Sequence, residues 1–207
     1  MFNLFRKKPI PINFNISLLI ITDTHNCLTY EELEEKTKGK KFDACLLLGD
    51  LSDEDLYIIK NEIKNIPIYG VLGNHYGWDL YDKYNIENIH GKVIEINGIR
   101  IAGIQGGLKY KNANTALYTD QESVEIAKKI EPADILISHD SPKHFHGKDD
   151  FAHSGLKGIT YYCKKNKVPL NIHGHHHRHR IGVLKNGTRV MCCYGIEVVN
   201  IIADEKW

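Results

Sequence analysis

The 207-residue sequence predicts an α/β fold with two mixed β-sheets and helices on the outside. Apolar strands alternate with helical segments in the first part of the chain, which is typical of βαβ units and a parallel sheet. Two Asn-Gly turns between apolar runs in the later part are typical of β-hairpins. A chain of this length buries enough surface for a core without disulfides. We therefore expect a single domain over residues 1–207, with residues 1–14 as an N-terminal extension.

The first three strands and two helices follow from apolar runs and capping signals. Residues 16–21 are apolar except for Ser17, which indicates a strand buried on both faces. Capping-box patterns at Thr29 and Ser52 predict two helices, the first reaching about Lys38. Two further apolar runs, at 43–48 and at 68–72, follow these helices and predict the second and third strands.

Hairpins and helices share the rest of the chain. Asn97-Gly98 predicts a hairpin between 92–96 and 99–104. A capping box at Thr119 predicts a helix reaching Ile130. A long polar loop, 144–155, is of the kind that is functional or mobile in compact domains. The remaining expected elements are a strand at 133–138, a helix at 154–165, a strand at 170–173 and a final meander of 180–184, 189–194 and 197–202 around Asn186-Gly187.

Composition excludes several classes of protein. Twenty-seven basic and 26 acidic residues give a net charge of +1, so no global field favours nucleic acid or anionic lipid. The longest apolar run is far shorter than the ~20 residues of a membrane span. Residues 1–12 lack the apolar region of a secretory signal. Five cysteines without a CxxC pair predict reduced, small apolar side chains. We therefore expect a cytoplasmic protein without a membrane partner.

Polar side chains follow five of the predicted strands. Any one of them is typical of an ordinary turn or cap, but together they place acids, an amide and imidazoles where strands end. Because ligands of open α/β sheets bind beyond the carboxyl ends of strands, we expect these side chains at one edge. The five segments are Asp23-Thr24-His25, Gly49-Asp50, Gly73-Asn74-His75, Ser138-His139 and His173-Gly174-His175-His176-His177.

The donor types predict a transition-metal site. Carboxylates, an amide and imidazoles without a thiolate suit manganese, iron, zinc, nickel or cobalt better than magnesium or calcium. The donors exceed what one tetrahedral ion uses, whereas two ions roughly 3.5–4 Å apart, with one bridging carboxylate, would use them all. Two divalent ions with Asp23 and Asp50 leave positive charge for a hydroxide and a phosphate oxygen. This charge distribution favours phosphoester hydrolysis.

The ordered motifs resemble those of the calcineurin-like metallophosphoesterases over about residues 16–200. The resemblance implies a sandwich of two sheets with flanking helices and a binuclear centre, with manganese as the first expectation for both ions. It implies that a hydroxide bridging the two ions attacks a phosphodiester or phosphomonoester. It further implies that Asp50 bridges both ions and that His75 contacts the phosphate and protonates the leaving oxygen. The first ion would be held by Asp23, His25, Asp50 and His177, and the second by Asp50, Asn74, His139 and His175.

Two departures from the family pattern bear on function. Tyr76 stands where the family often has an acidic residue after His75, so another carboxylate, such as Asp79, would have to orient that imidazole. The segment after Asp50 carries no arginine, which disfavours a phosphoprotein phosphatase. We expect a small phosphoester or short nucleotide substrate. A nuclease of short or single-stranded nucleic acid and a non-catalytic scaffold on the same fold are the alternatives.

Histidines outside the motifs are expected to have other roles. His90 is expected in a loop, and His173 beside the ligands or in a structural role. His176 and His179 alternate with the ligands, so an extended backbone would point them toward solvent. Three more histidines lie in the polar loop and could approach the site: His144, His146 and His153.

Overall fold

Two large β-sheets form the centre of the protein, whose computed structural model describes residues 8–147 and 150–203. One sheet has five strands in the order β13 (Gly195–Ile201), β1 (Ile16–Thr22), β2 (Ala44–Leu47), β3 (Ile68–Gly70) and β4 (Glu87–Asn88). The other has six strands in the order β11 (Arg180–Val183), β12 (Arg189–Cys192), β10 (Leu170–His173), β9 (Ile135–Ser138), β6 (Ile99–Ile104) and β5 (Val93–Ile96). We call them the five-stranded and six-stranded sheets. A short pair, β7 (Gly107–Leu108) and β8 (Leu117–Tyr118), lies apart from both.

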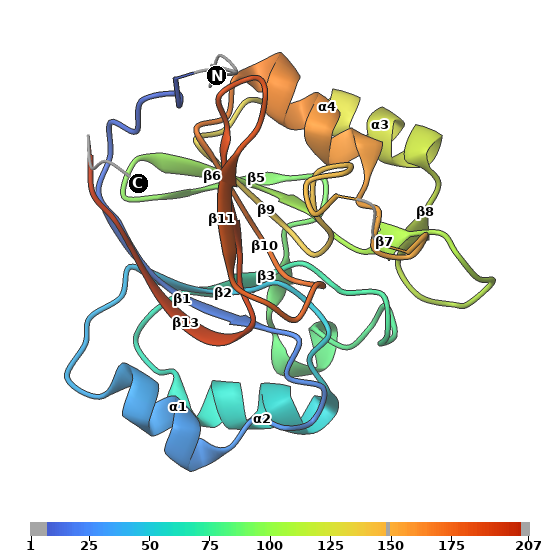
Figure 1. Cartoon of the computed structure of the whole chain (residues 1–207). Helices are drawn as coiled ribbons and strands as arrows, with labels where there is room; N and C mark the ends of the chain where they lie inside the picture. Colours follow the sequence, from blue (N-terminus) through green and yellow to red (C-terminus); the bar gives the residue numbers. More distant parts are fainter. Residues whose placement is uncertain (1–7, 148–149, 204–207) are drawn as a thin grey trace.

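The sheets pack face to face with helices on both outer faces, as Figure 1 shows. The five-stranded sheet is covered by α1 (Tyr30–Thr37) and α2 (Asp53–Glu62), and the six-stranded sheet by α3 (Asp120–Lys129) and α4 (Lys157–Asn166). A single 3₁₀ turn, η1 (Asp82–Tyr84), precedes β4. The predicted sandwich of two mixed sheets with flanking helices is therefore confirmed.

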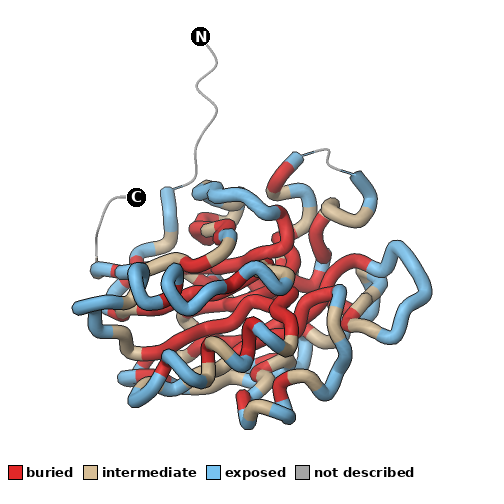
Figure 2. Tube along the Cα trace, turned by 90° about the horizontal axis from the view of Figure 1, so that it is seen from below, coloured by how far each residue is buried: buried red, intermediate tan, exposed pale blue. Residues whose placement is uncertain are grey.

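Strand β1 shows why the centre of its sequence is continuously apolar. Leu18 and Ile20 face the other sheet and belong to the core between the sheets. Leu19 and Ile21 point the other way, into the core under the helices α1 and α2. All four are fully buried, because successive side chains of a strand alternate between two covered faces. Figure 2 shows the same burial along the central strands.

Turn and capping signals in the sequence predicted the bounds of these helices and strands to within a few residues. Asn97 and Gly98 both have positive φ, 52° and 80°, and join β5 to β6 as an antiparallel hairpin. The predicted caps are also present, since the Ser52 and Thr119 side chains accept hydrogen bonds from the backbone N–H of Asp55 and Glu122. Helix α4 begins at Lys157, three residues later than expected.

The predicted final meander is wrong. β11 and β12 do form a hairpin, but β13 leaves that sheet and pairs antiparallel with β1, from Ile16 opposite Ile201 to Thr22 opposite Gly195. The local pattern of an apolar strand is the same whichever neighbour it pairs with. The partner is decided by which sheet edge is open, and β13 closes the edge beside β1.

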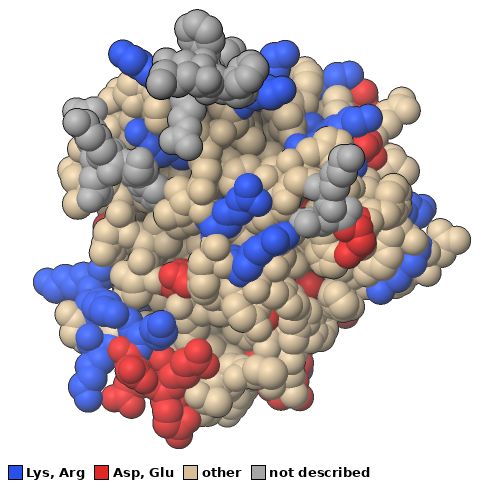
Figure 3. All heavy atoms as spheres, in the orientation of Figure 1, with Lys and Arg blue, Asp and Glu red and all other residues tan. Residues whose placement is uncertain are grey.

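The described surface carries no large basic face in the view of Figure 3, where acidic and basic side chains are mixed, most densely over α1. Within residues 8–147 and 150–203, helices are all too short or too polar to cross a lipid bilayer.

Candidate metal centre

The candidate ligands lie where strands of both sheets end. Asp23, Asp50 and Asn74 follow β1, β2 and β3 of the five-stranded sheet, whereas His139 and His175 follow β9 and β10 of the six-stranded sheet. Five candidate ligands turn sharply out of their strands in the left-handed region of φ, a conformation that Asp, Asn and His tolerate better than most residues. These φ values are 55° at Asp23, 47° at His25, 53° at Asp50, 69° at His175 and 47° at His177.

A first cluster joins Asp23, His25 and His177, whose ligand atoms lie within 4.8 Å of one another. The Nε2 atoms of His25 and His177 are 3.2 Å apart, and His177 Nε2 is 3.5 Å from Asp23 Oδ1. Two imidazole nitrogens that share one ion at about 2.1 Å lie roughly 3.0–3.4 Å apart, depending on the coordination angle. The spacing of the two rings therefore fits a shared metal ion.

A second cluster joins Asp50, His139 and His175, all buried. His139 Nε2 lies 3.4 Å from Asp50 Oδ2 and 2.8 Å from Asn74 Oδ1. His139 Nδ1 lies 2.7 Å from the Leu48 carbonyl, to which it can donate a hydrogen bond. Such a bond orients the ring so that Nε2 faces Asp50 and Asn74, where a metal ion would take the place of the proton on Nε2.

Asp50 connects the two clusters. Its Oδ2 is 3.4 Å from His139 Nε2 in the second cluster and 3.9 Å from His25 Nε2 in the first. Its Oδ1 accepts a hydrogen bond from the backbone N–H of His75. Glycine is required beside it, because a Cβ at Gly73 would stand 2.0 Å from Asp50 Oδ1. The carboxylate is thus held between the two clusters.

The surroundings of the two buried carboxylates suit a site for cations. Asp23 and Asp50 are 1% and 2% exposed, and within the described part of the chain Asp23 Oδ1 accepts no hydrogen bond. Burial raises the pKa of Asp23, but the neighbouring His177 imidazole and the charge of His139 outweigh it and hold the pKa below its ordinary value. Burial lowers the pKa of His139, yet the charge of Asp50 overcomes this effect and raises it to about 9. A buried carboxylate with an unused oxygen fits a divalent ion.

His75 lies at the mouth of the site with its side chain half exposed. Its Nε2 is 3.7 Å from Asp50 Oδ2, and its ring meets the His25 ring edge-on, with centroids 5.1 Å apart. Partial burial lowers the pKa of His75, and the charge of Asp50 opposes this effect. The carboxylate that His75 faces is therefore Asp50 itself, and a contact with Asp79 is not needed to place the ring.

The polar loop reaches the histidines that follow β10 through two of its own histidines. The ring of His153 stacks on that of His175, with centroids 4.8 Å apart. The ring of His146 is buried and stacks on His176 at 3.7 Å, whereas His144 is exposed.

The expected exposure of His176 is wrong. Its side chain is buried between His146 and Asp140, and its Nε2 lies 3.8 Å from Asp140 Oδ1. The left-handed residues on either side of His176 break the strand alternation on which the expectation depended. His179 is exposed as expected and pairs with Glu197.

Sequence reasoning missed two polar features beside the site. Asp140 is fully buried and accepts a hydrogen bond from the Leu108 backbone; its place directly after His139 was the available signal. A third cluster of potential ligands joins His146, His173 and Cys192. All five cysteines are free, and four are buried as expected of small apolar side chains, but Cys27 is exposed.

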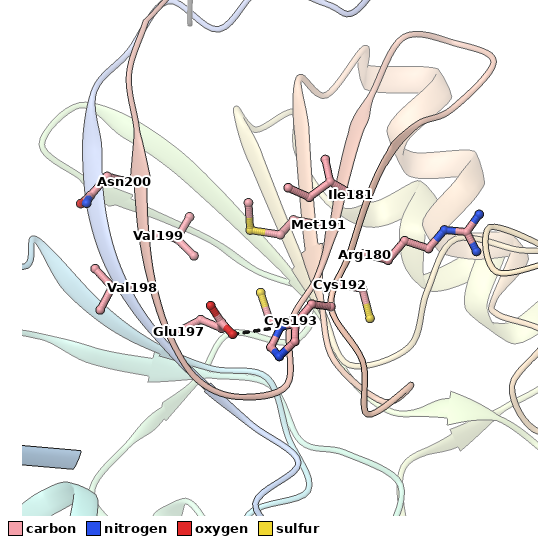
Figure 4. A pocket seen from close by; sticks show the side chains of 10 residues that line it. Arg180, Ile181, Met191, Cys192, Cys193, Glu197, Val198, Val199 and Asn200 are labelled. Atoms are coloured by element: carbon pink, nitrogen blue, oxygen red, sulfur yellow. Dashed lines mark ion pairs between the residues drawn. The ribbon is translucent and has the colours of Figure 1, made fainter. Parts of the chain in front are cut away.

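A separate groove runs between β12 and β13, lined by Met191, Cys193 and Val199 among others (Figure 4). Its lining residues include none of the seven candidate ligands at the strand ends. The groove is therefore distinct from the two clusters joined by Asp50.

Comparisons with known proteins identify the fold and the family of this chain. The family model of the calcineurin-like phosphoesterases matches residues 16–179. An uncharacterised protein of Haemophilus influenzae is 24% identical over 197 residues, covering 77% of this chain and 83% of its own. The solved structure of the Thermus thermophilus protein TT1561 matches with a TM-score of 0.62 at 13% identity, covering 90% of this chain and 99% of its own. The phosphopantetheinyl hydrolase of Mycobacterium tuberculosis matches with a TM-score of 0.59 at 12% identity, covering 89% and 91%. The match of the family model over most of the sequence shows that this chain belongs to the calcineurin-like phosphoesterase family, hydrolases of phosphoester bonds that use divalent metals.

Proposed function

We propose that this protein hydrolyses a small phosphodiester or phosphomonoester with two divalent transition-metal ions, manganese being the first expectation. The observation that carries the proposal is the position of Asp50 between two clusters that each supply a carboxylate and imidazoles. The first ion is assigned to Asp23, His25, Asp50 and His177, and the second to Asp50, Asn74, His139 and His175. Five free cysteines are typical of a reducing compartment, so we place this activity in the cytoplasm.

The chemistry divides between the ions and the protein. When bound, the ions supply Lewis-acid activation of water and of the phosphoryl group. The protein's own groups do the rest: the buried carboxylates and imidazoles fix the positions of positive charge, and His75 faces the substrate from the exposed side. We assign to His75 Nε2 a contact with the phosphoryl group and the donation of a proton to the leaving oxygen.

A complete donor set favours catalysis over a scaffold role. A scaffold protein needs no ligands, so substitutions would accumulate at the strand ends, but all seven candidate residues carry donor groups and converge.

Two exposed tyrosines favour short nucleotides as a second substrate class. Tyr194 stacks on His177 with centroids 5.1 Å apart, and the Tyr110 hydroxyl lies 3.4 Å from Asn74 Nδ2. Both rings are about two-fifths exposed. Aromatic faces beside a phosphate site can stack a nucleobase.

The proposal is tested by Asp50→Asn, with Asp53→Asn as the matched control. Asp50 is buried between the clusters, whereas Asp53 has a half-exposed side chain that pairs with Lys83. Loss of the shared carboxylate is expected to lower kcat on bis-p-nitrophenyl phosphate or p-nitrophenyl phosphate by on the order of 10³, a loss typical of a removed charge-stabilising group. The Asp53→Asn protein should retain wild-type rates.

Metal content and turnover are measured on the same preparations. Chelation should abolish turnover, and Mn²⁺, Ni²⁺ or Co²⁺ should restore it. Near-normal turnover by folded Asp50→Asn protein, or turnover that chelation leaves untouched, would contradict the proposal.

A further inference from the structure

We propose that Cys192, His173 and His146 form a third metal site, separate from the two clusters joined by Asp50 and selective for a thiolate-binding ion such as Zn²⁺. Their potential ligand atoms lie within 4.8 Å of one another, and all three residues are buried, with exposed fractions of 2%, 0% and 8%. One thiol and two imidazoles are ligand types of protein zinc sites.

The sheet register fixes two of the three ligands. His173 is the last residue of β10 and Cys192 the last residue of β12, and the two are direct partners in this parallel pair. Partner residues on neighbouring strands project their side chains from the same face of the sheet. An imidazole and a thiol are therefore held side by side by backbone hydrogen bonds, before any metal binds.

The tautomer of His173 suits metal binding. Its Nδ1 lies 2.9 Å from the Gly174 carbonyl, so this nitrogen carries the proton and donates it to that oxygen. Nε2 is then left with its lone pair, as in metal-bound histidines whose second nitrogen donates to a backbone carbonyl.

The third ligand comes from the polar loop. His146 Nε2 lies 3.4 Å from His173 Nε2. Two imidazole nitrogens that share a tetrahedral zinc ion at about 2.0–2.1 Å lie roughly 3.4 Å apart. The same distance also fits a long hydrogen bond between the two rings. Cobalt binding distinguishes this hydrogen bond from a shared metal ion.

A metal here would tie the loop to the sheet beside the catalytic centre. The loop that carries His146 also carries His153, which stacks on the candidate ligand His175. The ring of Phe145 packs against both His146 and His173 and shields the cluster. The role that follows is structural: the ion fixes the position of the loop that borders the phosphoester site.

Cys193 provides a matched control. It is as buried as Cys192, but Figure 4 shows its sulfur pointing into the groove beside β13 while that of Cys192 points to the opposite side. Both thiols have a pKa raised by burial, that of Cys192 to about 12. A metal ion must displace the thiol proton in order to bind.

The test uses Co²⁺ loaded into chelator-treated full-length protein, because a cobalt–thiolate bond gives a charge-transfer band in the near ultraviolet. The two clusters joined by Asp50 contain no thiol among their candidate ligands, and cysteine variants assign the band to one of the five thiols. We expect the band in wild type and in Cys193→Ala, and its loss in Cys192→Ala. Zn²⁺ content should fall by about one equivalent in Cys192→Ala when wild type and variant are loaded under the same conditions.

Two further variants separate loss of the third site from misfolding and from loss of the proposed catalytic site. His146→Ala lies on a loop, so it tests the site even if Cys192→Ala does not fold, and it should also lose the band. Asp50→Asn should retain the band, which distinguishes this site from the proposed catalytic one. A wild-type protein without the band, or a band that survives in folded Cys192→Ala or His146→Ala, would overturn the proposal.

Discussion

Individual side chains in this protein have roles that depend on burial. Asp50 is buried and shared between two clusters, whereas His75 is only 3.7 Å away from it and half exposed. A buried anion can hold cations, and an imidazole that solvent reaches can exchange protons with substrate and water. The depth of Asp50 therefore suits the role of metal ligand proposed for it, and the exposure of His75 suits its proposed role of proton donor.

His75→Ala tests the proton-donor role. A proton donor matters most when the leaving oxygen is strongly basic, so the variant should lose more activity on alkyl phosphoesters than on p-nitrophenyl esters. The expected difference is on the order of 10²-fold, the contribution typical of general acid catalysis. The measurement is kcat/KM for a series of leaving groups. Equal losses across the series would leave His75 as a phosphate contact only.

At the scale of secondary structure elements, strands supply the site and helices supply stability. The helix α3 begins with a reciprocal capping box, in which Thr119 Oγ1 accepts from the Glu122 backbone and Glu122 Oε2 accepts from the Thr119 backbone. This box is far from the candidate ligands in sequence and involves only exposed side chains. A substitution in this capping box should therefore change the stability of α3 without changing activity.

Thr119→Ala is expected to lower the free energy of unfolding by about 1 kcal/mol, the usual cost of losing an N-cap. Urea denaturation measures this loss, with the exposed Gln121→Ala as control, and turnover should be unchanged. Hydrogen bonds from Thr119 hold the pKa of Glu122 below its ordinary 4.5. The box therefore stabilises the fold fully above that value and less as the pH falls through the lowered pKa, so the difference between wild type and variant should shrink in acid. A loss of turnover equal to that of Asp50→Asn would contradict this separation.

At the scale of the whole molecule, the candidate metal centre joins the two sheets. Asp23 and Asp50 follow strands of the five-stranded sheet, and His139 and His175 follow strands of the six-stranded sheet. The two sheets also share the apolar core between them. Metal ions at their common edge would therefore stabilise the packing of one sheet on the other.

Chelation is expected to lower the thermal midpoint of unfolding. An ion present at 100 times its Kd adds about 2.7 kcal/mol to the folded state, which corresponds to roughly 5–10 °C for a chain of this size. Calorimetry with and without Mn²⁺ measures the shift, since a thiolate site has little preference for Mn²⁺. Asp50→Asn should show a clearly smaller shift. Identical midpoints for chelated and Mn²⁺-loaded wild type would contradict a centre that joins the sheets.

Sequence predicted what local chemistry decides. Asn97-Gly98 requires positive φ at two successive residues, so its hairpin was predictable. The candidate ligands were predictable as a group, because parallel strands bring their carboxyl ends to one edge.

Features that depend on strand pairing were not predictable. The sequence of β13 does not determine which sheet edge it pairs with. The contact between His173 and Cys192 depends on the register of β10 and β12. Burial of His176 depends on the left-handed turns around it. No residue pattern within a single segment carries this information.

The antiparallel pairing of β1 with β13 has a mechanical consequence. Ile16 and Ile201 are partners at one end of the ladder, and the Ala203 backbone bonds to Asn15 just beyond it. Tension applied through these two neighbouring positions would load the interstrand bonds singly, in succession, rather than all together in shear. The edge strand β13 would then separate from β1 one hydrogen bond at a time. Pulling should therefore unfold this protein at low force, starting at the end of the ladder opposite its strand-end histidines.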